Sequence, residues 1–527
     1  ALGGAEIMLI IKNLTIKNAK GSILLDDFSL TLSSHDKAAI IGEEGNGKST
    51  LLKAVYDQSL IDEYASVSGV IQKNNCRIGM LSQKLDSAWF DSTICDYCLK
   101  ETVDEEIAYE RYNELMNLEK LCVQLRLDPL MLSSQQLIKT LSGGEKVKLQ
   151  LLKLMSRHYD VLLLDEPTND LDLDTLMWLE RFMNEYEGAL LYVSHDETLL
   201  SRTATRIILL EQVNKKTKVR HSIYNIGYDQ FVQEHQASAI KAEQLANKEK
   251  EIYEKKREKL LKILNAVHDA QNSCSRQDPH TARLLKKKMH SVKSMEKRFE
   301  KESYTKLDTV EEAIDVMFDD FDWNPSKVIL DADFCVEIAD QRLIEPFELH
   351  VRGFEKVVFI GPNGCGKTTL MKQIIELLKN RSDLKLGIMP QNYQEQMPYE
   401  MAAVDFLAPD HDKDTVTRAR EMLGRMKFTR DEMAAPIHSL SEGQKAKLFL
   451  LRFIMEQCNV LLLDEPTRNL SPMSNPALRE CLCDFKGCIL SVSHDRRYIQ
   501  EVCTTIYQVK EKQLVKIDKL QLELSLN

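Results

Sequence analysis

Short runs of apolar residues, each followed at once by polar or glycine-rich text, recur along the chain. The run VLLLDE begins at Val161 and again at Val460, while AAII and KVVFI lead directly into Gly42 and Gly361. Unbroken apolar runs of this length predict strands that are buried on both faces, as in a parallel sheet. The text after each glycine-rich loop, STLLKAVYD and TTLMKQIIELLK, has a helical pattern. We therefore predict an α/β fold that occurs twice.

A different pattern fills the middle of the chain. Between about residues 231 and 304 there is no glycine, and Pro279 is the only proline. Apolar residues recur there at spacings of three or four, as at Leu260, Leu264 and Val267, and this periodicity is typical of helices. The polar stretch around Pro279 predicts a break between two long helices, with a tip near 267–283. A first helix of about 30 residues would extend about 45 Å.

Several strings in the first half return in the second half. LSGGEKVKLQLL at Leu141, VLLLDEPTNDLD at Val161 and YVSHDE at Tyr192 all have counterparts 299 residues later. The glycine-rich strings GEEGNGKST and GPNGCGKTT are offset by 319 residues instead. The chain is thus a tandem duplication. We expect a first domain at 1–230, a helical linker at 231–306 and a second domain at 307–527.

Both glycine-rich strings match GxxxxGK[ST] between a strand and a helix, which is the context in which this motif binds phosphate. Lys48 and Lys367 would reach the β- and γ-phosphates, and the residue after each lysine offers a hydroxyl to Mg²⁺. We predict two nucleotide sites, with ATP and Mg²⁺ as cofactors. The candidate nucleotide-binding residues of these loops are Gly42, Glu43, Gly45, Asn46, Gly47, Lys48, Ser49, Thr50, Gly361, Asn363, Gly364, Cys365, Gly366, Lys367, Thr368 and Thr369.

Acidic residues and a histidine recur at matched positions after the later strands. Asp165 and Asp464 end apolar runs, where a carboxylate can bind the magnesium shell. The candidate catalytic residues are Glu166, Glu465, His195 and His494. Each glutamate would polarise an attacking water, and each histidine, 29 residues further on, would contact the γ-phosphate. The predicted reaction is hydrolysis of ATP to ADP and phosphate.

Charge is unevenly distributed along the chain. The formal net charge is −11, but residues 241–300 hold sixteen Lys/Arg and nine Asp/Glu, so this segment is +7 and the remainder is −18. Eight of these cations lie between Arg276 and Arg298. Such a run is compatible with a solvated helix face and with binding to nucleic-acid phosphates, and charge alone leaves both interpretations open.

The composition of the chain indicates the cellular compartment in which we expect the protein. No stretch approaches the roughly 18 consecutive apolar residues of a membrane span, and the N-terminus lacks a basic region followed by an apolar segment. The twelve cysteines are scattered through apolar text rather than spaced as a secreted disulfide framework. We expect a cytoplasmic protein.

Taken together, these motifs resemble those of ATP-binding cassette ATPases, whose signature motif matches LSGGE at Leu141 and LSEGQ at Leu440. The resemblance implies that the two domains enclose two ATP molecules, each between one P-loop and the signature of the other copy. Carried over by position, the residues that contact ATP on the second P-loop are Ser142, Gly143 and Gly144, and those that contact ATP on the first are Ser441 and Gly443.

The same resemblance identifies Gln83 and Gln391 as Q-loop glutamines that contact the metal. The implied metal ligands are Ser49, Gln83, Asp165, Thr368, Gln391 and Asp464. Two departures stand out. Asn18 and Ala19 occupy the position at which the family places an aromatic residue under adenine, and the second copy has no clear Tyr or Phe there. In the second copy RNLS replaces NDLD, so that Asn469 and Ser471 stand where acids are usual.

The tandem domains and the basic helical linker resemble the ABC-F group of translation factors. The string LDEPTRNLSP at Leu463, together with the linker, is similar to the antibiotic-resistance ribosome protection branch, of the Vga and Lsa type. That resemblance implies a monomer whose domains pair within one chain. It also implies binding at the tRNA exit site of the large ribosomal subunit, with 23S rRNA and P-site tRNA as neighbours. The linker tip would displace lincosamides, pleuromutilins and streptogramin A.

Two other functions remain open at the level of sequence. One is a general ABC-F translation factor acting on stalled or initiating ribosomes. The other is a soluble ATPase subunit of an importer, which would have no need of projecting basic helices. Association with ribosomes or with membranes separates the importer from the other two, and drug protection separates the ribosomal functions from each other.

Overall fold

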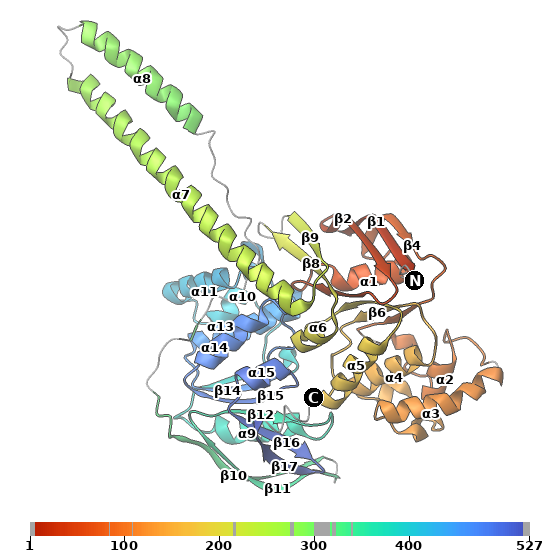
Figure 1. Ribbon diagram of the computed structural model, residues 1–527. Coiled ribbons are helices and arrows are strands. Elements are labelled where there is room, and N and C mark those ends of the chain that lie inside the picture. The colour runs from red at the N-terminus through yellow and green to blue at the C-terminus, as the bar shows by residue number, and fades with distance from the viewer. Residues whose placement is uncertain are drawn as a thin grey trace. The chain divides into compact units, whose positions relative to one another are not determined.

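The computed structural model describes residues 6–19, 21–83, 85–107, 109–213, 218–273, 279–299, 317–318, 323–338 and 341–519 (Figure 1). The chain forms two compact units. One unit comprises Ala1–Tyr228 and Val310–Asn527 and contains both α/β domains, while the other is Asp229–Thr309 and contains the linker helices. Each unit is described separately below.

Both α/β domains are built on a six-stranded sheet with equivalent strand orders, β5-β6-β7-β3-β8-β9 and β13-β14-β15-β12-β16-β17. In each sheet the last strand is antiparallel and the others are parallel. The first sheet contains β3 (Lys37–Ile41), β5 (Ile78–Leu81), β6 (Val161–Asp165), β7 (Ala189–Val193), β8 (Arg206–Val213) and β9 (Lys218–Tyr224). The second contains β12 (Lys356–Ile360), β13 (Leu386–Met389), β14 (Val460–Asp464), β15 (Cys488–Val492), β16 (Thr505–Lys510) and β17 (Gln513–Ile517). The predicted α/β duplication is confirmed.

Each domain also has a smaller antiparallel sheet. The first domain has the order β2-β1-β4 and the second pairs β10 with β11. These strands are β1 (Ile7–Asn18), β2 (Ile23–Ser33), β4 (Ala65–Gln72), β10 (Val328–Ile338) and β11 (Gln341–Arg352). Their buried apolar side chains join the cores formed by the main sheets.

Helices cover the sheets. In the first domain they are α1 (Lys48–Tyr56), α2 (Ile94–Leu99), α3 (Leu115–Gln124), α4 (Gly143–Met155), α5 (Leu173–Glu185) and α6 (Glu197–Thr203). In the second they are α9 (Lys367–Lys379), α10 (Ala403–Leu407), α11 (Lys413–Arg425), α12 (Arg430–Ala434), α13 (Glu442–Met455), α14 (Asn475–Asp484) and α15 (Arg496–Glu501). Strands β6 and β14 are buried at every position, as unbroken apolar runs between two helical layers should be.

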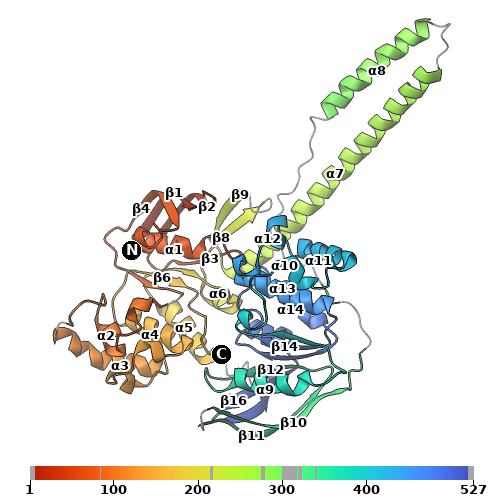
Figure 2. The same cartoon turned by 180° about the vertical axis from the view of Figure 1, so that it is seen from behind.

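The linker unit consists of α7 (Tyr228–Ser273) and α8 (Pro279–Phe299), which run side by side in opposite directions (Figures 1 and 2). Our expectation of a first helix of about 30 residues was wrong, because α7 has 46 residues. No glycine or proline interrupts the sequence from Tyr228 to Ser273, so nothing ends the helix earlier. Pro279 begins α8, a position where its missing N–H costs nothing. Of the predicted tip at 267–283, residues 274–278 lie outside the described part.

Buried ion pairs join the two α/β domains. Arg479 on α14 donates two hydrogen bonds to the carboxylate of Glu197 on α6, and Arg496 on α15 donates to Glu180 on α5. Arg497 also contacts Glu197, with 3.0 Å between Nη1 and Oε2. The first four side chains are each no more than 5 % exposed. We call these five residues the interdomain ion-pair cluster.

The cluster follows the duplication. Glu180 and Arg479 are 299 residues apart, and so are Glu197 and Arg496, so each acid of the first domain is the positional counterpart of an arginine in the second. Two first domains facing each other in this way would oppose acid to acid, and two second domains would oppose arginine to arginine. The charges therefore favour pairing of unlike domains, as in this chain.

We expect removal of one partner of the Arg479–Glu197 pair to be strongly destabilising, because the other charge is left buried. Arg479→Leu and Glu197→Leu should each lower the free energy of unfolding by about 3–5 kcal/mol, and the double variant should lose clearly less than the sum. Urea unfolding measures this. Arg342→Leu, which breaks the half-exposed contact to Glu337, is the matched control and should change stability little. Strict additivity of the two buried changes would contradict the assignment.

Candidate active site

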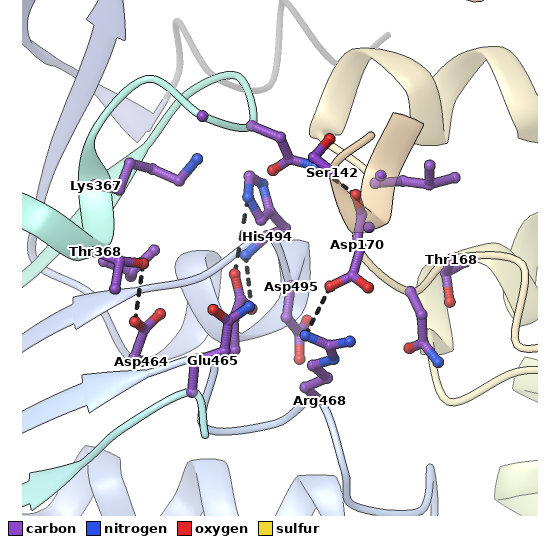
Figure 3. A pocket seen from close by; sticks show the side chains of 18 of the residues that line it. Ser142, Thr168, Asp170, Lys367, Thr368, Asp464, Glu465, Arg468, His494 and Asp495 are labelled. Atoms are coloured by element: carbon purple, nitrogen blue, oxygen red, sulfur yellow. Dashed lines mark hydrogen bonds and ion pairs between the residues drawn. The ribbon is translucent and has the colours of Figure 1, made fainter. Parts of the chain in front are cut away.

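A cavity of about 650 Å³ lies between the two domains at the second glycine-rich loop. The second domain lines one side with Lys367, Thr368 and Glu465, and the first lines the other with the signature residues Ser142 and Gly144 (Figure 3). The remaining predicted residues in the lining are Gly143, Asn363, Gly364, Gly366, Thr369, Gln391, Asp464, His195 and His494. The P-loop of the second copy thus faces the signature of the first, as the family resemblance implies.

Glycines in the left-handed backbone conformation shape both P-loops. Gly47 and Gly366, which precede the helices α1 and α9, have φ of 81° and 99°, a region that side chains disfavour. A Cβ at Gly366 would approach Val336 to 3.0 Å. Lys48 Nζ donates to the carbonyls of Gly42 and Glu43 at 2.8 and 3.0 Å, and Lys367 makes the equivalent bonds at 2.8 Å each. Each ammonium is therefore held over the loop where phosphate would bind.

A hydroxyl and an aspartate meet beside each P-loop. Ser49 Oγ donates to Asp165 Oδ1 at 2.9 Å, and Thr368 Oγ1 donates to Asp464 Oδ2 at 3.1 Å. The other oxygen of Asp165 is buried and, within the described part of the chain, accepts no hydrogen bond. Hard oxygen donors with a spare acceptor of this kind suit Mg²⁺. The residues present therefore fit the ion that the fold family implies.

Each candidate catalytic glutamate is paired with its histidine. His195 Nε2 lies 3.0 Å from Glu166 Oε1, and the His195 backbone N–H donates to Oε2 at 3.2 Å. The second copy repeats this arrangement at 3.8 and 3.3 Å for His494 and Glu465. Both glutamates have positive φ, 50° and 54°, which is a strained backbone for a residue with a side chain. Each of these glutamates directly follows the last residue of its strand, β6 or β14.

Burial sets the protonation of these pairs. It raises the pKa of Glu166 to about 8, and burial together with the nearby Asp464 raises the pKa of Glu465 to about 8. Burial, with a smaller contribution from Lys48, lowers the pKa of His195 well below its usual value, and burial and Lys367 lower that of His494 to about 3. Both imidazoles are therefore neutral at neutral pH, and each carboxyl is mostly protonated there, so it must lose its proton before it can act as a base.

The second site contains contacts that the sequence did not indicate. Asn363 donates through Nδ2 to the backbone carbonyl of Asp170, and Arg468 Nη1 lies 2.8 Å from the carboxylate of Asp170. A Cβ on Gly144 would come within 2.4 Å of that same carbonyl. Asp170 and Arg468 are thus interface residues that motif matching missed. The signal was available, because Arg468 belongs to the RNLS string that departs from NDLD.

The first P-loop meets the second signature through different chemistry. Gly443 N donates to Glu44 Oε2 at 2.7 Å, and Ser471 and Ser474 donate to Glu43 at 2.5 and 2.7 Å. Ser441 and Gly443 therefore lie opposite the first P-loop, as expected. Glu44 was not among the predicted residues. Its position is visible in the sequence as the acid that replaces Asn363 of the second loop.

The Q-loop glutamines are placed differently in the two copies. Gln391 lines the cavity, whereas Gln83 is exposed. Among the described residues that line this cavity there is no Phe, Tyr or Trp, and Ile338 and Leu343 contribute aliphatic surface to it. An aliphatic surface offers dispersion contact to a base without the geometry of ring stacking.

Comparison with known proteins identifies the family. The family described as ABC transporter matches residues 25–169 and 344–468, about half of the chain. The chain belongs to the ABC transporter family. It is an ATPase, and its α/β domains are ATP-binding cassettes, which bind ATP. Among the described residues, no helix is long and apolar enough to cross a membrane.

Similar proteins match this ABC ATPase along nearly its whole length. The putative ATP-binding protein YdiF of Bacillus subtilis is 27 % identical, with 96 % of this chain and 81 % of YdiF covered. The ABC transporter F family member 2 of Arabidopsis thaliana is 26 % identical, covering 94 % and 75 %. Among solved structures, the archaeal ribosome recycling factor aABCE1, in complex with ribosomal stalk protein aP1, has the same fold, with a TM-score of 0.59, 15 % identity and coverage of 98 % and 92 %.

The raised pKa values predict how hydrolysis by this ABC ATPase depends on pH. A glutamate can accept a proton from water only when it is ionised, so kcat/KM for ATP should rise between about pH 6 and about pH 9 as the carboxyls lose their protons. Steady-state phosphate release across this range measures the effect. A flat profile would contradict the protonated resting state. Glu166→Gln with Glu465→Gln should remove the pH-dependent activity, by at least about a hundredfold.

Proposed function

We propose that this ABC ATPase is a cytoplasmic ribosome-binding factor that couples closure of its two cassettes on ATP to contact with ribosomal RNA. The observation that carries the proposal is the second nucleotide site, which both cassettes line. A nucleotide bound there contacts Lys367 on one cassette and the signature residues on the other, so binding energy is available to hold the cassettes together. Hydrolysis would remove the γ-phosphate contacts and release them.

The chemistry assigned to each site follows from its geometry. The P-loop amides and lysine would hold the phosphates, with the opposing signature donors on the γ-phosphate. Mg²⁺ would be held by Ser49, Asp165 and Gln83 in the first site and by Thr368, Asp464 and Gln391 in the second, where it neutralises phosphate charge. Glu166 and Glu465 would accept the proton of the attacking water, and His195 and His494 would contact the γ-phosphate.

The linker helices supply a surface suited to RNA. On α8 the lysines Lys286, Lys287 and Lys288 are exposed, while Val292 is buried and Met289 is half-buried. The helix therefore packs through its apolar residues and presents cations to solvent. Exposed lysines in such a row bind phosphate backbones through release of counterions, without reading sequence.

Similarity supports the ribosome as the partner. The fold neighbour aABCE1 is named as a ribosome recycling factor, and a relative that matches 94 % of this chain is named an F family member. We propose the functional division 1–230, 231–306 and 307–527, with the cassettes pairing within one monomer. The interdomain ion-pair cluster supports such pairing, since its charges disfavour contact between like domains.

Within this function we propose ribosome protection against antibiotics. In this role the protein enters the tRNA exit site of the large subunit, next to 23S rRNA and P-site tRNA. Its linker tip, near 267–283, displaces lincosamides, pleuromutilins and streptogramin A. The support is the LDEPTRNLSP string and the long linker. The alternative within the same group is a general translation factor, which the resemblance to a recycling factor favours.

The first test traps the closed state. Glu166→Gln with Glu465→Gln should retain ATP binding and abolish turnover, so the variant should co-sediment with ribosomes in ATP far more than the parent, which dissociates after hydrolysis. Lys48→Ala with Lys367→Ala, which weakens phosphate binding, is the matched control and should not be retained. Equally weak sedimentation of the parent and the glutamine variant would refute ATP-driven ribosome binding.

The second test separates the two ribosomal functions. Expression in a drug-susceptible bacterium should raise the minimum inhibitory concentrations of the three drug classes several-fold, and the P-loop double variant should not. A drug that acts away from the peptidyl-transferase centre serves as the control for general tolerance. Normal ribosome binding without any change in drug susceptibility would instead indicate a general translation factor.

A further inference from the structure

The first P-loop carries two carboxylates where the second carries none. Glu43 and Glu44 occupy the positions of Pro362 and Asn363. We call them the P-loop carboxylate pair. Both side chains reach across the interface to the second cassette, and neither belongs to the pattern that identifies a P-loop.

Glu44 contacts both donors that the second signature offers. Gly443 N donates to its Oε2 at 2.7 Å, and the Ser441 hydroxyl donates to the same carboxyl. Ser441 is the N-cap of α13, so Gly443 N is one of the amides that the helix leaves without an internal partner. Such amides favour an anion, whether it belongs to a phosphate or to a side chain.

The difference from the second site has a simple chemical cause. Asn363 has an NH₂ group and donates it to the carbonyl of Asp170. The equivalent carbonyl opposite Glu44 is that of Asn469, which lies 2.7 Å from where a Cβ on Gly443 would be. Burial raises the pKa of the Glu44 carboxyl, whereas the hydrogen bonds from Gly443 and Ser441 oppose that rise and favour the ionised form. In that form the carboxylate has no proton to give to a carbonyl. It therefore turns to the signature donors instead.

Glu43 fixes this arrangement from the other side. Its carboxylate accepts from Ser471 and Ser474, and its Oε2 lies 3.8 Å from Lys447 Nζ. In the first cassette the counterpart of Lys447 is Lys148, which lies 3.7 Å from Asp172 of its own cassette.

In the first cassette the acid that pairs with Lys148 is Asp172, in the loop after DEPT. In the second cassette the acid that pairs with Lys447 is instead Glu43, on the opposite P-loop. Ser471, which replaces Asp172 in the second copy, is what leaves room for Glu43 without charge repulsion. Burial opposes ionisation of Glu43, but Lys447 and the two serines outweigh it and lower the pKa of this carboxyl. The GEEG and RNLS departures are therefore one structural feature.

We propose that Glu44 takes the place of the nucleotide γ-phosphate on the second signature, so that the first site accepts a nucleoside diphosphate at least as readily as a triphosphate. ATP turnover then falls mainly to the second site, where Asn363 leaves the signature donors to the nucleotide. The inference rests on the ATPase assignment of both sites and not on ribosome binding. It is tested on the purified chain without ribosomes.

The test measures nucleotide binding to the full chain carrying Glu166→Gln and Glu465→Gln, by equilibrium dialysis with labelled ATP or ADP and Mg²⁺. One ATP should bind tightly, at the second site, and another should bind at the first site with an affinity at least about tenfold lower. Lys48→Ala should abolish the weak binding, and Lys367→Ala should abolish the tight binding. Adding Glu44→Asn should raise the affinity of the weak site for ATP by about tenfold, and should change its affinity for ADP by less than about threefold.

Two further variants separate charge from shape. Glu44→Gln keeps the size and removes the charge, so it should tighten ATP at the first site as Glu44→Asn does. Asn363→Glu transfers the carboxylate to the second site and should weaken ATP there by about tenfold, with ADP little affected. Equal ATP affinities at both sites of the parent, or no gain with either Glu44 variant, would overturn the proposal. Because Asn363→Glu probes the opposite site, the proposal stays testable if a Glu44 variant folds poorly.

Discussion

The pairing of two unlike domains by buried charge is the interaction on which the rest of this structure depends. The cavity at the second P-loop exists only because the first domain contributes its other wall, and the two domains are joined by side chains that are each costly to bury alone. Arg479 and Arg496 each bond to an acid of the first domain. Hydrophobic contact holds each domain together internally, but the charges determine which surfaces meet.

The chain arose by duplication of one domain, and later substitutions that differ between the two copies explain most of the contacts at their interface. Both copies keep the hydroxyl, aspartate, glutamate and histidine in matching geometry, down to the positive φ of Glu166 and Glu465. The differences concentrate where one copy touches the other. Acids oppose arginines at 299-residue offsets, and the first P-loop supplies a carboxylate that the loop after the second DEPT has lost. The copies have become complementary partners, and each depends on the other to balance its charges.

The sequence predicted the parts of the fold that depend on local pattern. Buried strands such as β6 and β14 follow from apolar runs, and the phosphate loops follow from glycines and a lysine at fixed spacing. The length of α7 was underestimated, because helical periodicity weakens where charged residues fill every face and only the absence of glycine and proline signals continuation. The contacts of Glu44 with Gly443 and of Glu197 with Arg479 were beyond prediction. They join residues about 400 and 280 positions apart, and no local pattern indicates which side chains meet.

The first residue of α7 has a mechanical consequence. Tyr228 is buried, its hydroxyl donates to the Pro472 carbonyl of the second cassette at 3.4 Å, and Arg497 lies over its ring. The root of a helix that leaves the first cassette is therefore held by the second. A helix of 46 residues is about 69 Å long, so a tilt of about 5° at its first turn moves its far end by about 6 Å. A change in how the two cassettes meet therefore acts directly on Tyr228, the first residue of this long helix.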